Sequence, residues 1–403
     1  MLIVQKFGGT SVGDLDRIQN VANRVQKTLN QGHKVVVVVS AMSGETNKLV
    51  GYAEHFSSNP SAAEVDMLLS SGERVTASLL SIALNEMGHP TVAMTGRQAG
   101  IVTTSKHTKA RIENIDSTNM QNAIDAGKIV VVAGFQGVNE EGMVTTLGRG
   151  GSDLSAVAIA GALNADLCEI YTDVDGIYTT DPRIEPKAKK IDKISYEEML
   201  EMASLGAKVL QNRSVEMAKK LNVNLVTRSS FSEEEGTLIT KEENIMEQPL
   251  VSGVALDRNQ ARVSLVGVTD RPGIAAEIFN TLADDEINID VILQTVAHDG
   301  TTNIDFTVPT NELESAKSIV KTFVEKGEIK STDFNESIAK VSIVGVGMKS
   351  HAGVAAKAFS AMAAENINIR MISTSEIKVS MVIEEKYSEL AVRSLHSAFE
   401  LDK

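Results

Sequence analysis

The chain has 403 residues, of which 42% are hydrophobic, so at about 100–200 residues per domain it should hold more than one domain with large buried cores. Lys and Arg number 39 against 53 Asp and Glu, and the net charge of −14 argues against nucleic acid or an anionic membrane as the main partner. An anionic ligand would need a locally basic pocket.

The chain begins with an apolar run, residues 2–4, that leads into Lys6-Phe7-Gly8-Gly9-Thr10-Ser11 and then into an amphipathic pattern. This order predicts a strand, a glycine turn and a helix. Adjacent glycines let backbone N–H groups approach a ligand, the helix start adds a positive dipole end, and Lys6 adds a point charge. A phosphate cradle and an ordinary turn are equally good interpretations here, because lone glycine pairs are common in αβ connections. The chain has neither a Walker A loop nor a G-x-G-x-x-G fingerprint, so a phosphate site here would have a different design.

Short aliphatic runs alternate with helical patterns through residue 240. The helical spacing of the first pattern, from Leu15 to Leu29, stops at Gly32, and Ser195-Tyr196-Glu197-Glu198 is a capping box. The aliphatic runs are residues 2–4, 35–39, 91–94, 129–133, 167–171 and 224–226. Nearly continuous aliphatic strands between helices predict an α/β fold with a mostly parallel sheet covered on both faces.

A second glycine cluster, Gly148-Arg149-Gly150-Gly151-Ser152-Asp153, precedes an alanine-rich helical pattern. An arginine in a glycine turn beside a helix start suits bidentate capture of a carboxylate or phosphate. The alternative is a loop with a solvated arginine, and the presence of two such clusters in one domain disfavours it.

A polar loop, residues 171–183, follows a predicted buried strand. Ligands of open α/β folds bind at the carboxyl ends of parallel strands. The acidic residues of this loop do not have EF-hand spacing, so the loop is interpreted as holding a nucleoside, with Arg183 near its phosphates.

The composition shifts to Ser, Glu and Gly around residues 229–246, which predicts a domain boundary. Beyond it the sequence repeats. Val263-Ser264-Leu265-Val266-Gly267-Val268 recurs at 341–346, and Gly273-Ile274-Ala275-Ala276 recurs at 353–356. Each copy is predicted to form a strand, a glycine loop, a helix, an Asn-containing turn and a strand. The copies are either paired regulatory modules or duplicated scaffolding without a ligand.

The single cysteine, Cys168, lies in an apolar run and is predicted to be a small core residue, because one cysteine builds neither a disulfide nor a cysteine metal site. The longest aliphatic runs are strand-sized, well short of the ~18 apolar residues of a membrane span, and the N-terminus has no signal-peptide pattern. We therefore expect a cytoplasmic protein.

Taken together, the motifs closely resemble those of the aspartokinase (aspartate kinase) branch of the amino acid kinase family, followed by two ACT domains. The resemblance covers essentially the whole chain. The motifs that carry it are Lys6 to Ser11, Ser40-Ala41-Met42 with Thr46-Asn47, Gly72-Glu73, Gly148 to Asp153, and Thr172-Asp173 with Asp181-Pro182-Arg183.

The resemblance implies a three-layer amino acid kinase domain at residues 1–240 and a linker at 241–249. It also implies two ferredoxin-like ACT domains, the first at 262–335 and the second from 250–261 together with 336–403. The implied reaction is ATP-dependent phosphorylation of the L-aspartate β-carboxylate to 4-phospho-L-aspartate, with Mg²⁺. This is the first step of lysine, threonine, methionine and diaminopimelate biosynthesis.

The family pattern also implies roles for individual residues. The catalytic residues would be Lys6, Asp153 and Lys208, with Asp153 orienting the lysines. The nucleotide would contact Lys6, Phe7, Gly8, Gly9, Thr10, Ser11, Thr172, Asp173, Tyr178, Arg183, Lys208 and Val209. The aspartate substrate would contact Thr46, Glu73, Arg149 and Ser152, with Arg149 on a carboxylate and Glu73 on the ammonium. Where the family usually continues with His-Pro after Leu210, this chain has Gln211-Asn212.

The chemistry fits these roles. The attacking β-carboxylate has an ordinary pKa of about 3.9 and is ionised at neutral pH, so no general base is required. Phosphoryl transfer requires in-line placement of two anions and neutralisation of charge on the moving group, which Mg²⁺ and lysines would supply.

Feedback inhibition through the ACT domains is implied as well, with lysine as the leading effector and threonine acting jointly or not at all. The effector residues would be Asp270, Gly273, Ile274, Ala275, Asn288, Asp290, Gln294, Val354, Ala355, Asn368, Ile369, Ser375 and Glu376. The assembly would be a homodimer through the ACT domains, or an α2β2 complex with a small subunit from an internal start near Met246.

Two alternatives remain. One is another amino acid kinase, acting on glutamate or acetylglutamate, which the tandem repeat disfavours. The other is an amino acid sensor with an inactive kinase half, which the presence of Lys6, Arg149, Asp153 and Lys208 disfavours.

Overall fold

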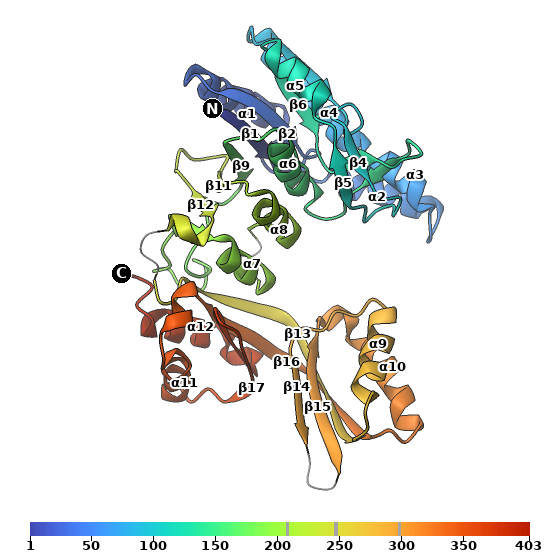
Figure 1. The fold of residues 1–403 in the computed structure, drawn as a ribbon, viewed down its shortest axis with the longest axis vertical. Coiled ribbons are helices and arrows are strands. Elements are labelled where there is room, and N and C mark those ends of the chain that lie inside the picture. The colour runs from blue at the N-terminus through green and yellow to red at the C-terminus, as the bar shows by residue number, and fades with distance from the viewer. Residues whose placement is uncertain (207–208, 246–248, 297–299) are drawn as a thin grey trace. The chain divides into compact units, whose positions relative to one another are not determined.

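The computed structural model describes residues 1–206, 209–245, 249–296 and 300–403. They form two compact units (Figure 1). The first comprises Met1–Tyr178, Lys190–Ser204 and the described residues within Lys208–Glu247. The second comprises Thr179–Lys189 and the described residues from 205 and from 249 to Lys403. The chain therefore passes between the two units several times.

The first unit is a mixture of strands and helices. Its strands are β1 (Leu2–Phe7), β2 (Lys34–Val39), β3 (Thr91–Met94), β4 (Ile101–Thr103), β5 (Ile112–Ile115), β6 (Ile129–Ala133), β7 (Gln136–Val138), β8 (Val144–Thr146), β9 (Leu167–Thr172), β10 (Lys193–Ser195), β11 (Leu225–Ser229) and β12 (Thr237–Thr240). Its helices are α1 (Leu15–Asn30), α2 (Glu45–Phe56), α3 (Ala62–Leu69), α4 (Ser71–Glu86), α5 (Thr118–Asp125), α6 (Gly151–Ala162), α7 (Tyr196–Ser204) and α8 (Asn212–Leu221).

The main sheet of this unit has eight strands in the order β10-β12-β11-β9-β1-β2-β6-β3. Its neighbouring strands pair in parallel except for β11 and β12, which are antiparallel. Five of the six predicted aliphatic runs lie within strands β1, β2, β3, β6 and β9, and the sixth overlaps β11. The predicted α/β fold with a mostly parallel sheet is thus confirmed.

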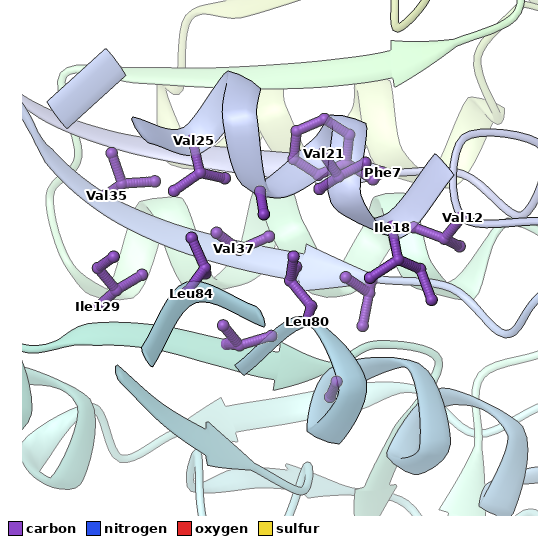
Figure 2. Close-up of a cluster of buried hydrophobic side chains, with 14 of the residues drawn as sticks. Phe7, Val12, Ile18, Val21, Val25, Val35, Val37, Leu80, Leu84 and Ile129 are labelled. Atoms are coloured by element: carbon purple, nitrogen blue, oxygen red, sulfur yellow. The ribbon is translucent and has the colours of Figure 1, made fainter. Parts of the chain in front are cut away.

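Helices cover both faces of the sheet. Val35, Val37 and Phe7 point into a buried cluster with α1 and α4 (Figure 2). On the other side, α6 packs against β1, β2 and β9. Because side chains alternate along a strand, Lys6 leaves β1 on the α6 side, opposite its neighbour Phe7. This alternation places a lysine beside the start of α6.

Two features of the first unit were not predicted. The short strands β5, β4, β7 and β8 form a separate four-stranded sheet in that order, and β12 lies within the stretch rich in Ser, Glu and Gly. The predicted capping box at α7 is present: the Glu198 carboxylate accepts from the Ser195 N–H at 3.1 Å, and the Ser195 hydroxyl accepts from the Glu198 N–H at 3.2 Å.

The second unit is built on one six-stranded sheet, β14-β15-β13-β16-β18-β17. Its strands are β13 (Gly253–Thr269), β14 (Ile292–Val296), β15 (Thr301–Val308), β16 (Ile329–Val344), β17 (Ile369–Thr374) and β18 (Lys378–Glu384). Its helices are α9 (Ile274–Asp284), α10 (Leu313–Glu325), α11 (Val354–Ala364) and α12 (Ser388–Ala398). The repeat appears as β13–α9–β14 and β16–α11–β17, each followed by a further strand and helix that the sequence did not predict.

The two repeats share their turn geometry. Gly273 and Gly353 precede α9 and α11 with φ of 94° and 89°, a left-handed conformation that favours glycine. After the same helices, Glu286 and Asn366 take φ of 56° and 54°. A left-handed Asn is common, whereas a left-handed Glu is uncommon. Within the described residues, no helix is long and apolar enough to cross a membrane.

Candidate functional site

A buried ion pair joins the two predicted glycine motifs. Lys6, near the end of β1, places its Nζ 2.6 Å from Oδ1 of Asp153 in the first turn of α6, and the two side chains are 9% and 12% exposed. An ammonium held this far from bulk water keeps a strong electrostatic effect on a nearby anion. The structure therefore brings together Lys6 and Asp153, two of the predicted catalytic residues.

The glycines after Lys6 form a close-packed cradle. A Cβ atom at Gly8 would lie 3.4 Å from Lys6 Nζ, and one at Gly9 would lie 3.1 Å from the Ala41 carbonyl oxygen. The Ser11 N–H bonds back to the Gly8 carbonyl at 2.9 Å. The Gly8 N–H donates to the Tyr171 carbonyl at 3.2 Å. Gly8 and Gly9 are both half-buried, so backbone without a side chain lies partly accessible beside the lysine, as a phosphate site requires.

The predicted nucleotide residues divide between side chains and backbone. Phe7 is fully buried and stacks on Tyr171, with ring centroids 4.6 Å apart, so only its backbone could reach a ligand. The Ser11 hydroxyl donates to Ser230 Oγ at 2.8 Å, and Ser230 donates to the Thr172 carbonyl at 3.0 Å. The structure thus brings Ser11 and Thr172 together.

The other predicted nucleotide residues have fewer contacts. Thr10 offers its carbonyl to Arg17 Nη1 at 2.6 Å, Asp173 is exposed, and Tyr178 is half-buried. Arg183 belongs to the second unit, where it is 90% exposed and pairs with Asp181 at 2.7 Å. Val209 is half-buried. Lys208 lies outside the described residues. The nucleotide roles of all these residues stay predictions.

Glu73 is the most unusual carboxylate of the site. It lies in the first turn of α4, 3% exposed, with Oε1 accepting the Ala41 N–H at 3.1 Å. Its Oε2 is buried and has no partner among the described residues. Burial raises the pKa of this carboxyl to about 7. A buried oxygen without a donor is costly to a fold, so it indicates a missing cationic or N–H partner.

The remaining predicted substrate residues are Thr46, Ser152 and Arg149. Thr46 is half-buried in the first turn of α2. Ser152 packs closely on Gly134, which follows β6. A Cβ atom added to Gly134 would lie 3.1 Å from the Ser152 Cβ. Arg149 is exposed, and its guanidinium forms no ion pair among the described residues. Arg149 therefore remains available to an anion.

Ala41 and Ser230 contact predicted site residues but were assigned no role from the sequence, although Ala41 lies in one of the motifs that carry the resemblance. Ala41 contributes only backbone, its carbonyl near Gly9 and its N–H on Glu73, and backbone roles leave no trace in residue type. Ser230 lies in the stretch predicted as a domain boundary, because its serines and glutamates read as a linker.

The predicted effector residues lie in the second unit at equivalent places of the two repeats. Ile274 and Val354 are buried at the starts of α9 and α11, and Ala275 and Ala355 follow them. Asp270 and Gly273 precede α9, Asn288 and Asp290 precede β14, Gln294 lies in β14, Asn368 and Ile369 lie at the start of β17, and Ser375 and Glu376 follow β17.

Asp290, the carboxylate considered for a cationic effector, already has a partner. It forms an ion pair with Lys340, a β16 lysine that is 2% exposed, and Lys340 also lies 4.0 Å from Asp257. A cationic effector at Asp290 would have to displace or share this ammonium.

A protein-built metal site is not found in the described part of the chain, which has no group of three or more His, Cys, Asp and Glu side chains able to hold an ion. Mg²⁺ keeps several waters and commonly binds through nucleotide phosphates, so it does not require a site built by protein side chains alone.

Comparison with known proteins is consistent with this geometry. Residues 1–228 match the model of the amino acid kinase family, and residues 263–322 and 341–399 match the model of an ACT domain. The chain is similar to the aspartokinase of Helicobacter pylori (strain J99), at 58% identity over 407 aligned positions that span 100% of both chains.

Solved structures are similar as well. E. coli aspartokinase III in complex with aspartate and ADP (R-state) gives a TM-score of 0.81 at 28% identity, over 99% of both chains. The same enzyme in complex with lysine and aspartate (T-state) gives a TM-score of 0.80 at 28% identity, again over 99% of both chains.

Proposed function

Because the chain belongs to the aspartokinases of the amino acid kinase family and carries ACT domains, we propose that this aspartate kinase converts L-aspartate and ATP to 4-phospho-L-aspartate and ADP. This reaction would begin lysine, threonine, methionine and diaminopimelate biosynthesis. The observation that carries the site assignment is the Lys6–Asp153 pair at 2.6 Å on the glycine cradle.

On the substrate side, Glu73 would accept the aspartate ammonium with its unpartnered Oε2. Arg149 would bind a substrate carboxylate in the bidentate manner that a guanidinium allows. Thr46 and Ser152 lie at helix starts, where a hydroxyl and backbone N–H groups can hold the second carboxylate. With the ammonium and one carboxylate fixed, the β-carboxylate is oriented as the nucleophile.

On the nucleotide side, the absence of side chains at Gly8 and Gly9 would let phosphate oxygens approach the backbone closely. Lys6 would stabilise the charge that develops on the transferring phosphoryl group. Asp153 holds the Lys6 ammonium in place. Lys208 would act as a second cation, a role supported by the family motif alone. Mg²⁺, held by the ATP phosphates, would supply further charge neutralisation.

Regulation would act through the ACT domains, with lysine as effector and threonine acting jointly or not at all. E. coli aspartokinase III with lysine and aspartate supports this assignment. We also propose domain bounds of 1–240, 241–249, 262–335, and 250–261 with 336–403. They are supported by the pairing of Gly253–Asp257 with Lys340–Val344 in the second half of the sheet. A homodimer through the ACT domains and an α2β2 complex are both compatible with this arrangement.

One assay tests the substrate assignment. ATP-dependent acyl phosphate is trapped as the hydroxamate with aspartate, with glutamate, and with no acceptor. We expect turnover with aspartate alone. Turnover with glutamate would favour another amino acid kinase, and no turnover with either acceptor would favour an inactive sensor. Adding lysine, with and without threonine, then tests inhibition, which would be wrong if initial rates did not change.

A further inference from the structure

Residues at the start of helix α8 contact the backbone beside the turn that carries Arg149. Arg213, in the first turn of α8, donates from Nη1 to the Leu147 carbonyl at 2.6 Å and from Nη2 to the Ala110 carbonyl at 3.1 Å. Leu147 immediately precedes the Gly148-Arg149-Gly150 turn. The guanidinium thus fixes the backbone one residue before the turn begins.

A second contact comes from the residue that caps the same helix. Gly150 has a φ of 70°, and a Cβ there would lie 2.0 Å from Gln211 Cγ. Gln211 therefore packs directly on the backbone at the end of the turn. Arg213 and Gln211 thus contact the backbone on the two sides of Arg149, and neither forms a hydrogen bond or ion pair with Arg149 itself.

The packing around this contact is small and apolar. Ala110, Leu147 and Leu154 form a buried cluster, and Met217, one turn further along α8, packs against it. Burial, with a contribution from nearby Arg111, lowers the pKa of the Arg213 guanidinium. Keeping a charge against this cost requires strong acceptors, which the two carbonyls provide.

We propose that Arg213 is a positioning residue for aspartate: it sets the starting point of the 148–150 turn and thereby the position from which the Arg149 guanidinium binds the substrate carboxylate. This inference rests on the proposed role of Arg149. Gln211-Asn212 is also where the chain departs from the usual His-Pro of the family. The contact of Gln211 with Gly150 therefore involves a residue that differs from the family pattern.

The test measures steady-state kinetics of Arg213→Met, with Arg213→Lys as the conservative variant and Lys220→Met as a matched loss of charge at an exposed position of the same helix. We expect Arg213→Met to raise the KM for aspartate about tenfold or more and to leave the KM for ATP within about twofold. Arg213→Lys should fall between this variant and the parent, and Lys220→Met should match the parent.

A merely structural role would give a different result. It would lower the melting temperature and the active fraction of Arg213→Met while the KM for aspartate stayed unchanged, and that outcome would overturn the proposal. If Arg213→Met does not fold, Arg213→Lys and Gln211→Ala carry the same comparison of the two KM values.

A double-mutant cycle separates this inference from the proposed function. Because Arg213 acts through Arg149, Arg213→Met should add little to the aspartate KM in an Arg149→Ala background. Additive effects would contradict the inference. If Arg149→Ala alone leaves the KM for aspartate unchanged, both the proposed substrate role of Arg149 and the inference about Arg213 are wrong. If Arg149→Ala raises the KM and Arg213→Met does not, only the role of Arg213 is wrong.

Discussion

Lys6 and Asp153, the ion pair that we propose acts in phosphoryl transfer, also belong to the buried part of the first unit. Each side chain is only about a tenth exposed, so the charges interact strongly and each would be costly without the other. Near the ammonium, only glycine backbone is present at positions 8 and 9. The Gly8 N–H already donates to the Tyr171 carbonyl at 3.2 Å, so the pair offers a positioned cation beside the half-buried backbone of Gly9.

Replacement of Lys6 by Met should reduce kcat by about 10²–10³, the range for loss of one preorganised transition-state donor. The same change leaves Asp153 without its partner, so we expect some loss of stability as well. Initial rates at saturating aspartate and ATP, with a thermal melt of each protein, measure both effects.

The matched control for this experiment is Lys34→Met, at the exposed start of neighbouring strand β2. It should keep parental kcat and melting temperature. A near-parental kcat in a folded Lys6→Met protein would show that Lys6 does not serve the reaction.

Glu73 predicts a pH dependence of substrate binding. Burial raises its pKa to about 7, and only the ionised form attracts an ammonium. The KM for aspartate should therefore fall as the pH rises through about 7, because the ionised fraction of Glu73 grows. In Glu73→Gln the aspartate KM should be higher at every pH and should lose this inflection, which a pH series of initial rates would reveal.

The same carboxyl also affects the stability of the unliganded protein. Raising the pH should improve aspartate binding but should lower this stability. The pKa of Glu73 is near 7 in the fold and near 4.5 when unfolded, so the fold binds the proton more tightly. The stabilisation that comes from protonating Glu73 is fully present below about pH 4.5 and is lost as the pH rises through about 7. At pH 8, Glu73→Gln should unfold at higher denaturant than the parent. Equal midpoints would argue that Oε2 is not buried without a partner.

At the scale of elements, the long aliphatic strands were predictable because parallel strands buried on both faces must be apolar along their whole length. The four-stranded sheet was not. Its strands β4, β7 and β8 have three residues each, too few to show a period, and long-range pairing holds them together. Likewise, the glycine loops were recognisable as candidate site elements from the sequence. The contact of Arg213 was not, because its two acceptors lie 66 and 103 residues away in the chain.

The equivalent turns after α9 and α11 differ in how well their residues suit the backbone. Glu286 and Asn366 both have left-handed φ, a conformation that costs most side chains about 1–2 kcal/mol but that Asn tolerates. Glu286→Gly should therefore raise the free energy of unfolding by about 1 kcal/mol, and Asn366→Gly should raise it less. Chemical denaturation of the two variants checks the order, and a larger gain at Asn366 would contradict it.

At the scale of the whole molecule, the chain leaves the first unit after Tyr178 and returns at Lys190, so the intervening segment folds with the second unit. There Thr179 Oγ1 lies 2.9 Å from Nε2 of His396 in α12, and that histidine is 1% exposed. The segment following the proposed nucleotide loop is thus anchored in the regulatory unit.

His396 makes this anchor sensitive to acid. Burial lowers its pKa below the usual 6.5, with Glu185 and Asp402 opposing the shift and Lys187 adding to it. A lowered pKa means that the unfolded chain binds the proton more readily, so stability should fall as the pH drops below about 6.5. The melting temperature of the parent should decline over that range more steeply than that of His396→Gln. Parallel declines would show that His396 does not titrate on unfolding.

The passage of residues 179–189 through the second unit also bears on how such genes can recombine. A regulatory half exchanged between relatives at a single junction near residue 246 would leave this segment behind, facing a foreign helix in place of α12. The histidine of the transferred half would then contact the recipient's residue at position 179 in place of its own Thr179. Functional chimeras should therefore exchange residues 179–189 together with the C-terminal half, and these two stretches should share their evolutionary origin although about 60 residues separate them in the chain.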